Sequence, residues 1–481
     1  MEDTSVTDRV TTGIAGLDAI LMGGLLNGST VIAQGPPGSG KTILANQLAF
    51  HRACQGELVV YVTLVAESHT RLLRHLRTLT FFEPSLVGDR ILYLSGYHAL
   101  RESATALLAL LQKELVVRRP GLLVVDGISA IQETHGVPAA RQFLHELQAS
   151  TESANCTALL VSATQTSPTP EDAVVDAAIF LAEHQVGVRP IREIQVHKTR
   201  GSSHLAGRHT FIIDARGLVV FPRIEALYRM PSQAPSEGET RVGFGRTGLD
   251  AMVGGGLRSG SSTLVLGATG TGKTLLGLTF LAAGLSHNET VIYSGFYETP
   301  DRLLASGDGI GLRLRDQAAA GRLHLEWRPP VELFIDAWAD RLLERVRTTR
   351  PRRLFIDGLN AILEGATRPE RLSAFLTALA NELRAHEVTT LISGEMHPIV
   401  GQNVDVPLPG VSPIVENTIL LRYVEDGTHL SRQIAVLKIR DSEHDSLIRT
   451  FSITGDGIVV GPARTPKPAA PRSRPRRRRR P

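Results

Sequence analysis

Short apolar runs alternate with longer amphipathic stretches along most of the chain. Residues 58–62 and 122–125 are wholly apolar and rich in Val and Leu, as expected of strands buried on both faces of a parallel sheet. Residues 68–79 and 104–117 carry apolar side chains at the three- and four-residue spacing of helices. This alternation predicts an α/β fold in which helices flank a mostly parallel sheet.

The second half of the chain repeats this order of elements. Lys41 has a counterpart in Lys273, 232 residues later, and Asp126 has one in Asp357, 231 residues later. Such a constant spacing indicates two homologous domains in tandem. Each copy closes with short β-like runs, at residues 178–182, 193–197, 210–213 and 218–221 and at residues 418–424, 433–437, 450–453 and 457–460.

Composition predicts where the domains end. Residues 231–240 are rich in Pro, Ser and Glu, so we expect a linker between a first domain, 1–230, and a second, 241–461. Residues 462–481 hold nine Arg and Lys and no acidic residue, which predicts a disordered basic tail. The formal net charge is +4, so the rest of the chain is mildly acidic and any contact with nucleic acid is expected only through the tail.

The overall composition is that of a soluble globular protein, with 42% hydrophobic and 21% charged residues. No apolar run approaches the ~18–20 residues of a membrane span, and the N-terminus lacks a signal segment. The two cysteines have no metal-like spacing. These features predict a cytoplasmic protein with no membrane partner.

Two glycine-rich loops each lie between a β-like run and a helical one. They fit the pattern G-x-x-x-x-G-K-[S/T], the first as Gly35, Pro36, Pro37, Gly38, Ser39, Gly40, Lys41 and Thr42, and the second as Gly267, Ala268, Thr269, Gly270, Thr271, Gly272, Lys273 and Thr274. In this setting the backbone N–H groups bind nucleotide phosphates, the lysine reaches the β and γ phosphates, and the threonine ligates Mg²⁺. The sequence therefore predicts that ATP and Mg²⁺ bind at both loops.

Two pairs of acids follow strands at the same predicted edge of the sheets. Asp126 and Asp357 each end an apolar strand, as does the Mg²⁺-binding acid known as Walker B. Glu67 and Glu298 each follow the second sheet strand and precede a helix. We expect these glutamates to orient or deprotonate the water that attacks the γ-phosphate.

A cationic segment also recurs. Lys198 and Arg200 in the first copy correspond to Lys438 and Arg440 in the second. Residues two apart in a strand face the same side, so each pair would form a two-pronged cationic probe. Cations of this kind often act on the γ-phosphate of a neighbouring subunit.

Together these residues resemble the KaiC branch of the RecA-like ATPases. The resemblance rests on the repeated Gly-Leu-Asp motif before each loop, the two loops, the Walker B strands, the K-x-R segments and residues 415–425, and it covers roughly residues 5–461. It implies two tandem RecA-like P-loop domains in a homohexameric ring, with ATP bound between subunits. It also implies that the K-x-R cations act in trans, and it suggests autokinase activity.

The chain departs from the family pattern at two places. The KaiC pattern has two adjacent glutamates after the second sheet strand, whereas each copy here has one, Glu67 or Glu298. Where the KaiC pattern has an autophosphorylated Ser-Thr pair, this chain has Ser412-Pro413; the proline has no hydroxyl, but Ser412 or a nearby hydroxyl could still accept a phosphoryl group.

Three classes of function fit the sequence. The first is a KaiC-like ring ATPase that serves as a nucleotide-dependent switch, acting on a regulatory partner that the sequence does not identify. The second is a DNA-dependent ATPase of the wider RecA family that binds nucleic acid through the basic tail. The third is a scaffold that binds nucleotide without turnover, which the intact loops and acids argue against.

Overall fold

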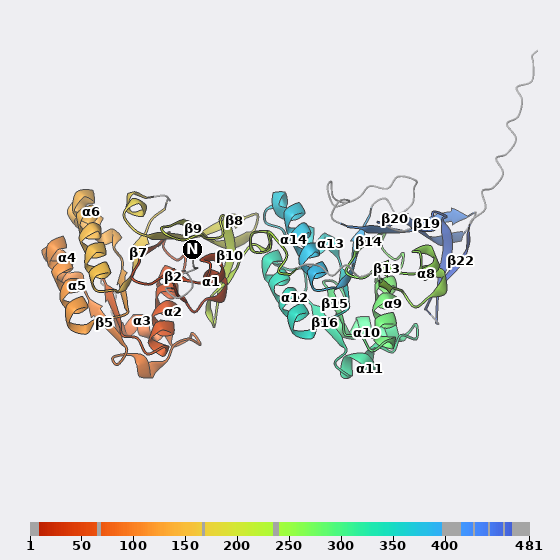
Figure 1. Ribbon diagram of the computed structural model, residues 1–481, viewed down its shortest axis with the longest axis horizontal. Helices are drawn as coiled ribbons and strands as arrows, with labels where there is room; N and C mark the ends of the chain where they lie inside the picture. The colour runs from red at the N-terminus through yellow and green to blue at the C-terminus, as the bar shows by residue number, and fades with distance from the viewer. Residues whose placement is uncertain are drawn as a thin grey trace, which may run out of the picture. The chain divides into compact units, whose positions relative to one another are not determined.

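The computed structural model describes residues 9–64, 69–165, 169–233, 240–396, 415–426, 429–440, 443–455 and 457–463. The chain divides into two compact units, Met1–Arg229 with Asp336–Asp340, and Met230–Ile335 with Arg341–Pro481 (Figure 1). Residues 234–239 of the predicted linker and 464–481 of the predicted tail lie outside the described residues. Within the described residues, no helix is long and apolar enough to cross a membrane.

The first unit is built on a nine-stranded sheet in the order β11-β10-β9-β8-β3-β7-β6-β4-β5. Its strands are β3 (Thr30–Gly35), β4 (Val59–Thr63), β5 (Ile91–Ser95), β6 (Leu122–Asp126), β7 (Thr157–Ala163), β8 (Ala177–Val186), β9 (Arg189–Thr199), β10 (Arg208–Asp214) and β11 (Gly217–Phe221). Strands β3 to β8 pair in parallel, whereas β8 to β11 form an antiparallel extension. The extension accounts for the four β-like runs that close the copy.

Helices cover both faces of this sheet. They are α1 (Ala15–Ile20), α2 (Lys41–Cys54), α3 (His69–Leu76), α4 (Tyr97–Glu102), α5 (Ala104–Arg118), α6 (Ser129–Ser153) and α7 (Ile224–Leu227), with short 3-10 turns η1 (Pro84–Leu86) and η2 (Pro170–Ala173). Helix α6 has a kink where Gly136 adopts φ 81° and Pro138 follows. A two-stranded pair, β1 (Arg9–Val10) and β2 (Leu25–Leu26), flanks α1.

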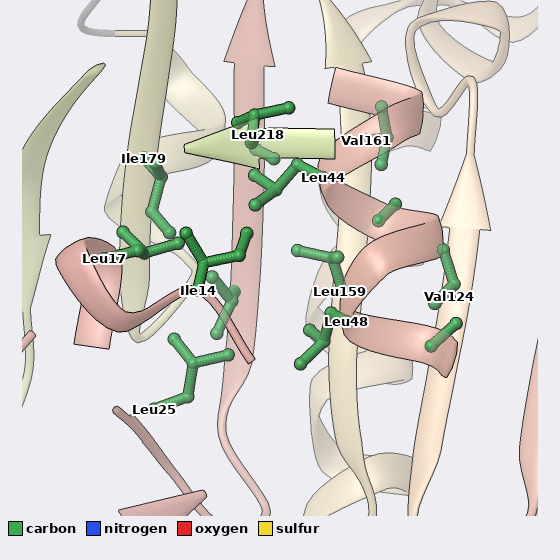
Figure 2. Packing of buried hydrophobic residues seen from close by; sticks show 14 of the residues in the cluster. Ile14, Leu17, Leu25, Leu44, Leu48, Val124, Leu159, Val161, Ile179 and Leu218 are labelled. Atoms are coloured by element: carbon green, nitrogen blue, oxygen red, sulfur yellow. The ribbon is translucent and has the colours of Figure 1, made fainter. Parts of the chain in front are cut away.

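Successive residues of the parallel strands point to opposite faces of the sheet, where they pack in two separate hydrophobic cores. Val124 packs with Leu44 and Leu48 of α2 on one face, in the cluster that Figure 2 shows. Its neighbour Val125 packs on the other face with residues of α5 and α6, including Leu111. Burial on both faces explains why these strands are continuous apolar runs, and it confirms the predicted α/β architecture.

The second unit has the same plan, with the sheet order β16-β15-β17-β18-β14-β19-β20-β21-β22. Its strands are β14 (Ser262–Gly267), β15 (Val291–Gly295), β16 (Leu323–Trp327), β17 (Arg353–Asp357), β18 (Thr389–Glu395), β19 (Asn417–Asp426), β20 (His429–Lys438), β21 (Arg449–Thr454) and β22 (Gly457–Ala463), with a separate pair β12 (Arg241–Val242) and β13 (Leu257–Arg258). Its helices are α8 (Thr247–Met252), α9 (Lys273–Ser286), α10 (Pro300–Asp308), α11 (Leu314–Ala319), α12 (Ile335–Thr349), α13 (Leu359–Gly365), η3 (Pro369–Arg371) and α14 (Leu372–Ala385). The two sheets confirm the prediction of tandem RecA-like domains.

Candidate nucleotide sites

Each glycine-rich loop connects the central strand of its sheet to a long helix. The first loop joins β3 to α2, and the second joins β14 to α9. Gly40 and Gly272 precede the helices with φ of 100° and 108°, a left-handed conformation that glycine adopts without a steric penalty. A Cβ on Gly35 would lie 2.0 Å from the carbonyl oxygen of Leu181, so the loop passes too close to β8 for a side chain.

The loop lysines lie over their own loops. Lys41 Nζ donates to the carbonyl oxygens of Gly35 and Pro36 at 2.8 and 2.7 Å. Lys273 Nζ makes the corresponding bonds to Gly267 and Ala268 at 2.8 and 2.9 Å. Burial lowers the pKa of both ammonium groups, and the nearby acids oppose that shift. Both cations therefore lie where a phosphate held by the loop amides would meet them.

In both copies the loop threonine contacts the acid at the end of the Walker B strand. Thr42 Oγ1 donates to Asp126 Oδ2 at 3.1 Å, and Thr274 Oγ1 donates to Asp357 Oδ2 at 2.9 Å. A hydroxyl and a carboxylate side by side are oxygen ligands of the kind that Mg²⁺ prefers. The residues present therefore fit a magnesium ion at each loop.

Burial raises the pKa of Asp357, while hydrogen bonds donated by Ser393, Thr274 and Tyr293 lower it. Two of these donors, Ser393 and Tyr293, were not anticipated from the sequence. Tyr61 in the first copy was missed in the same way, since its hydroxyl donates to Asp126 Oδ2 at 2.9 Å. The tyrosine that recurs at the same place in both copies was a signal that could have revealed Tyr61 and Tyr293, whereas nothing in the repeat pointed to Ser393.

The second site is a cavity of about 840 Å³. Its wall includes the loop, Asp357 and Glu298, which were predicted to act together. Glu298 Oε2 is buried and accepts no hydrogen bond from the described residues. A carboxylate oxygen in this state is available to accept a hydrogen bond from a bound water. Glu67, its predicted equivalent, lies outside the described residues.

Sequence reasoning also missed Arg432 and Tyr423, on neighbouring strands beside the second loop. Arg432 lines the cavity, and its guanidinium lies 5.5 Å from the centroid of the Tyr423 ring. The Tyr423 hydroxyl donates to the carbonyl oxygen of Gly270 at 2.6 Å. This pair brings a cation to the loop from the antiparallel part of the sheet.

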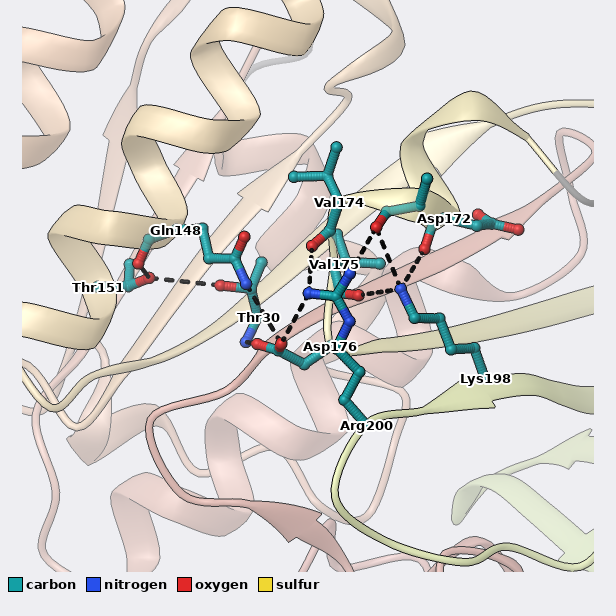
Figure 3. A network of polar contacts seen from close by, with 10 residues as sticks. Thr30, Gln148, Thr151, Asp172, Val174, Val175, Asp176, Lys198 and Arg200 are labelled. Atoms are coloured by element: carbon teal, nitrogen blue, oxygen red, sulfur yellow. Dashed lines mark hydrogen bonds and ion pairs between the residues drawn. The ribbon is translucent and has the colours of Figure 1, made fainter.

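The first K-x-R pair is bound to the turn that precedes β8 (Figure 3). Lys198 Nζ donates to the carbonyl oxygens of Asp172 and Val175, both at 2.7 Å, and to that of Ala173 at 3.3 Å. Arg200 Nη2 donates to the Ala173 carbonyl at 2.7 Å, and its Nη1 lies 3.8 Å from Asp176 Oδ1. The Lys198 ammonium and the Arg200 guanidinium therefore both bind one short turn of their own chain.

The second K-x-R pair contacts Val415 and Asn417, just before and at the start of β19. Lys438 Nζ donates to the carbonyl oxygen of Val415 at 3.1 Å. Arg440 is exposed, and its backbone N–H lies 3.4 Å from Asn417 Oδ1, which accepts from it. Ser412 and Pro413 lie outside the described residues.

A model of the family described as KaiC ATPase matches residues 10–225 and 242–465, which is most of both halves. The chain belongs to the KaiC ATPase family. The resemblance seen in the motifs is thereby confirmed, and with it the prediction of an ATPase that binds ATP. The match includes both tandem copies of the domain.

Curated KaiC proteins are similar to the chain over nearly its full length. The circadian clock protein KaiC3 of Synechocystis sp. is 28% identical over 483 residues, which cover 96% of this chain and 93% of that protein. The circadian clock oscillator protein KaiC of Nostoc sp. is 27% identical over 469 residues, covering 94% and 89%. The corresponding KaiC of Picosynechococcus sp. is 26% identical over 467 residues, covering 94% and 89%.

Proposed function

We propose that the protein is a KaiC-like ring ATPase that hydrolyses ATP at Mg²⁺-dependent sites between subunits and uses its nucleotide state as a regulatory switch. The observation that carries this proposal is the repeated contact between a loop threonine and a Walker B acid, at 3.1 Å in the first copy and 2.9 Å in the second. The pair fits Mg²⁺·ATP in both copies, and Glu298, with its buried Oε2 in the second cavity, would supply the proton acceptor that turnover needs and a scaffold does not.

In the proposed mechanism the loop amides and the loop lysine hold the β and γ phosphates. Bound Mg²⁺ would supply positive charge against the phosphate oxygens. Glu298 would orient the attacking water through its buried Oε2 and accept a proton from it. We assign the same role in the first copy to Glu67, on its sequence position. The loop lysines would then stabilise the charge that develops on the γ-phosphate.

The K-x-R cations complete the proposal across the subunit interface. In a homohexameric ring, Lys198 and Arg200, and likewise Lys438 and Arg440, would reach the nucleotide of the next subunit. Support comes from the recurrence of the segment in both copies, at and just beyond the ends of β9 and β20, and from the match of both copies to the KaiC family. A change of nucleotide would then alter contacts between subunits and the surface offered to a protein partner.

Autophosphorylation is the second activity that we propose, with Ser412 as acceptor. By the resemblance, Ser412 would correspond to the first residue of the family's phosphorylated Ser-Thr pair, and Pro413 would stand in place of the second. Mass spectrometry after incubation with Mg·ATP is expected to find phosphate on Ser412. The absence of phosphate on Ser412 and on neighbouring hydroxyls would refute this part and leave the ATPase intact.

The test of hydrolysis compares wild type with Glu67→Gln, Glu298→Gln and a double variant, with light scattering to measure assembly. Each substitution removes a proton acceptor at almost constant shape, so we expect turnover at the affected site to fall by about 10²–10⁴-fold. The matched control is Glu344→Gln, an exposed acid of α12 that pairs with Arg347. Unchanged turnover in the double variant would refute the glutamate roles, and a monomer in the presence of nucleotide would refute the interface site.

A further inference from the structure

Each Walker B acid is hydrogen-bonded by a buried tyrosine. Tyr61 donates to Asp126 Oδ2 at 2.9 Å, and Tyr293 donates to Asp357 Oδ2 at 3.2 Å. Both tyrosine side chains are almost fully buried, on strands β4 and β15 that pair with the Walker B strands. The accepting oxygen is in each case the one that also binds the loop threonine.

In the first copy a second polar layer fixes the direction of this bond. Asn46 Nδ2 donates to the Tyr61 hydroxyl at 3.1 Å, so the Tyr61 proton is directed to Asp126. Tyr93 in turn donates to Asn46 Oδ1 at 2.7 Å. Asn46 also donates to the carbonyl oxygen of Thr42 at 2.7 Å, which ties this layer to the start of α2. The chain of bonds runs without a break from β5 to the carboxylate.

The second copy keeps the hydrogen bond from the tyrosine to the Walker B acid, but the residues around that bond differ. Leu278 and Leu325 occupy the positions equivalent to Asn46 and Tyr93, so the polar layer is absent there. Instead, Ser393 donates to the other oxygen of Asp357 at 2.6 Å, at a position where the first copy has Val161.

In the second copy, Gly295 leaves room for the hydroxyl group of Tyr293. A Cβ on Gly295 would lie 2.2 Å from the Tyr293 hydroxyl oxygen, so any side chain there would displace the hydroxyl. Gly295 has no positive φ that would otherwise require glycine. In the second copy, glycine at this position therefore leaves room for the Tyr293 hydroxyl, whereas the first copy has Thr63 there.

We propose that Tyr61 and Tyr293 are positioning residues, which hold the Walker B carboxylates in the orientation that a magnesium ion at the loop requires. A carboxylate at a strand end can rotate about its Cβ–Cγ bond, and a tyrosine donor on Oδ2, in addition to the loop threonine, restricts that rotation. The two copies support this bond differently, yet both keep it. This inference rests on the proposed function, because it assigns a role toward the same Mg²⁺·ATP.

The test measures the Mg²⁺ requirement of nucleotide binding rather than turnover. A fluorescent ATP analogue is titrated with Mg²⁺, and separately in EDTA, against Tyr61→Phe in a Lys273→Ala background. Tyr293→Phe and Gly295→Ala are measured in a Lys41→Ala background, so that each experiment reports one loop. Removing an outer partner of a metal ligand typically lowers metal affinity by about 10–100-fold. We expect the Mg²⁺ midpoint to rise within that range, with binding in EDTA changed by less than about 2-fold.

Two matched controls make the same chemical changes elsewhere. Tyr97→Phe removes a hydroxyl from α4, and Gly455→Ala adds a methyl group where no atom lies within 4 Å. Neither should move the Mg²⁺ midpoint. An unchanged midpoint in all three test variants, or an equal loss of binding in EDTA, would overturn the positioning role. If the parent proteins bind no analogue under either condition, the proposed function fails and this inference falls with it.

Discussion

Arg353 gives a sharp test of how the second Walker B strand is held in place. Arg353 begins β17, the strand that ends in Asp357, and its side chain is 4% exposed. Its guanidinium donates to Glu289 at 2.6 and 3.3 Å and to the carbonyl oxygens of Gly243 and Phe280 at 2.6 and 2.9 Å. Replacing Arg353 with Met would leave a carboxylate and two carbonyls without this donor.

The expected loss is large because the Arg353 end of the pair is buried, although the Glu289 side chain is 24% exposed. Breaking a buried ion pair by removing one partner costs about 3–5 kcal/mol. A unit of this size loses about 2–4 °C of Tm for each kcal/mol, so Arg353→Met is expected to lower the transition by roughly 6–20 °C. Adding Glu289→Met should recover part of the loss, since the unpaired carboxylate is then also removed.

Thermal melting followed by tryptophan fluorescence is a suitable assay. Trp327 ends β16 in the unit that contains Arg353, so its fluorescence reports the affected unit. The matched control is Arg345→Met, which breaks an exposed pair with Glu326 and is expected to cost at most about 1 kcal/mol. If Arg353→Met melted within 2 °C of Arg345→Met, the assignment of a structural ion pair to Arg353 would be refuted.

Two further predictions concern the ends of the fold. Gly16→Ala would bring a Cβ to 1.9 Å from the Val220 carbonyl oxygen, and we expect a loss of about 1–3 kcal/mol in urea unfolding. A Cβ on Gly248 would lie 2.9 Å from the Val460 side chain and 3.7 Å from the Val460 carbonyl oxygen, so Gly248→Ala should cost less; the reverse order would contradict the packing argument. Deleting residues 464–481 removes nine cations and is expected to abolish any salt-dependent DNA binding while ATP turnover continues. DNA binding that survives the deletion would contradict this prediction and show that nucleic-acid contact is not confined to the tail.

The sequence predicted the parts of the site that depend on local backbone geometry. Both glycine-rich loops and both Walker B acids could be placed because a strand, a tight turn and a helix follow one another directly. Tyr61 and Ser393 could not be placed in this way. Their roles depend on which strands pair and in which register, and buried strands look alike whether or not one residue carries a hydroxyl.

The K-x-R segments show a different limit of sequence reasoning. The strand spacing predicted two cations on one side, but not the turn that Lys198 and Arg200 bind within their own chain. That contact depends on the path of residues 170–176, which no short pattern encodes. The polar layer of Asn46 and Tyr93 is similar, since it exists in one copy and is replaced by leucines in the other.

The three carbonyl bonds of Lys198 bear on how strongly subunits of a ring would attract one another. A phosphate on the next subunit would have to replace the carbonyls of Asp172, Ala173 and Val175 as partners of the same ammonium. The interface would then gain only the difference between two sets of contacts, and the turn before β8 would lose its anchor as the contact formed. A ring held by exchanged partners would open and close with the nucleotide, so assembly itself would become a readout of occupancy.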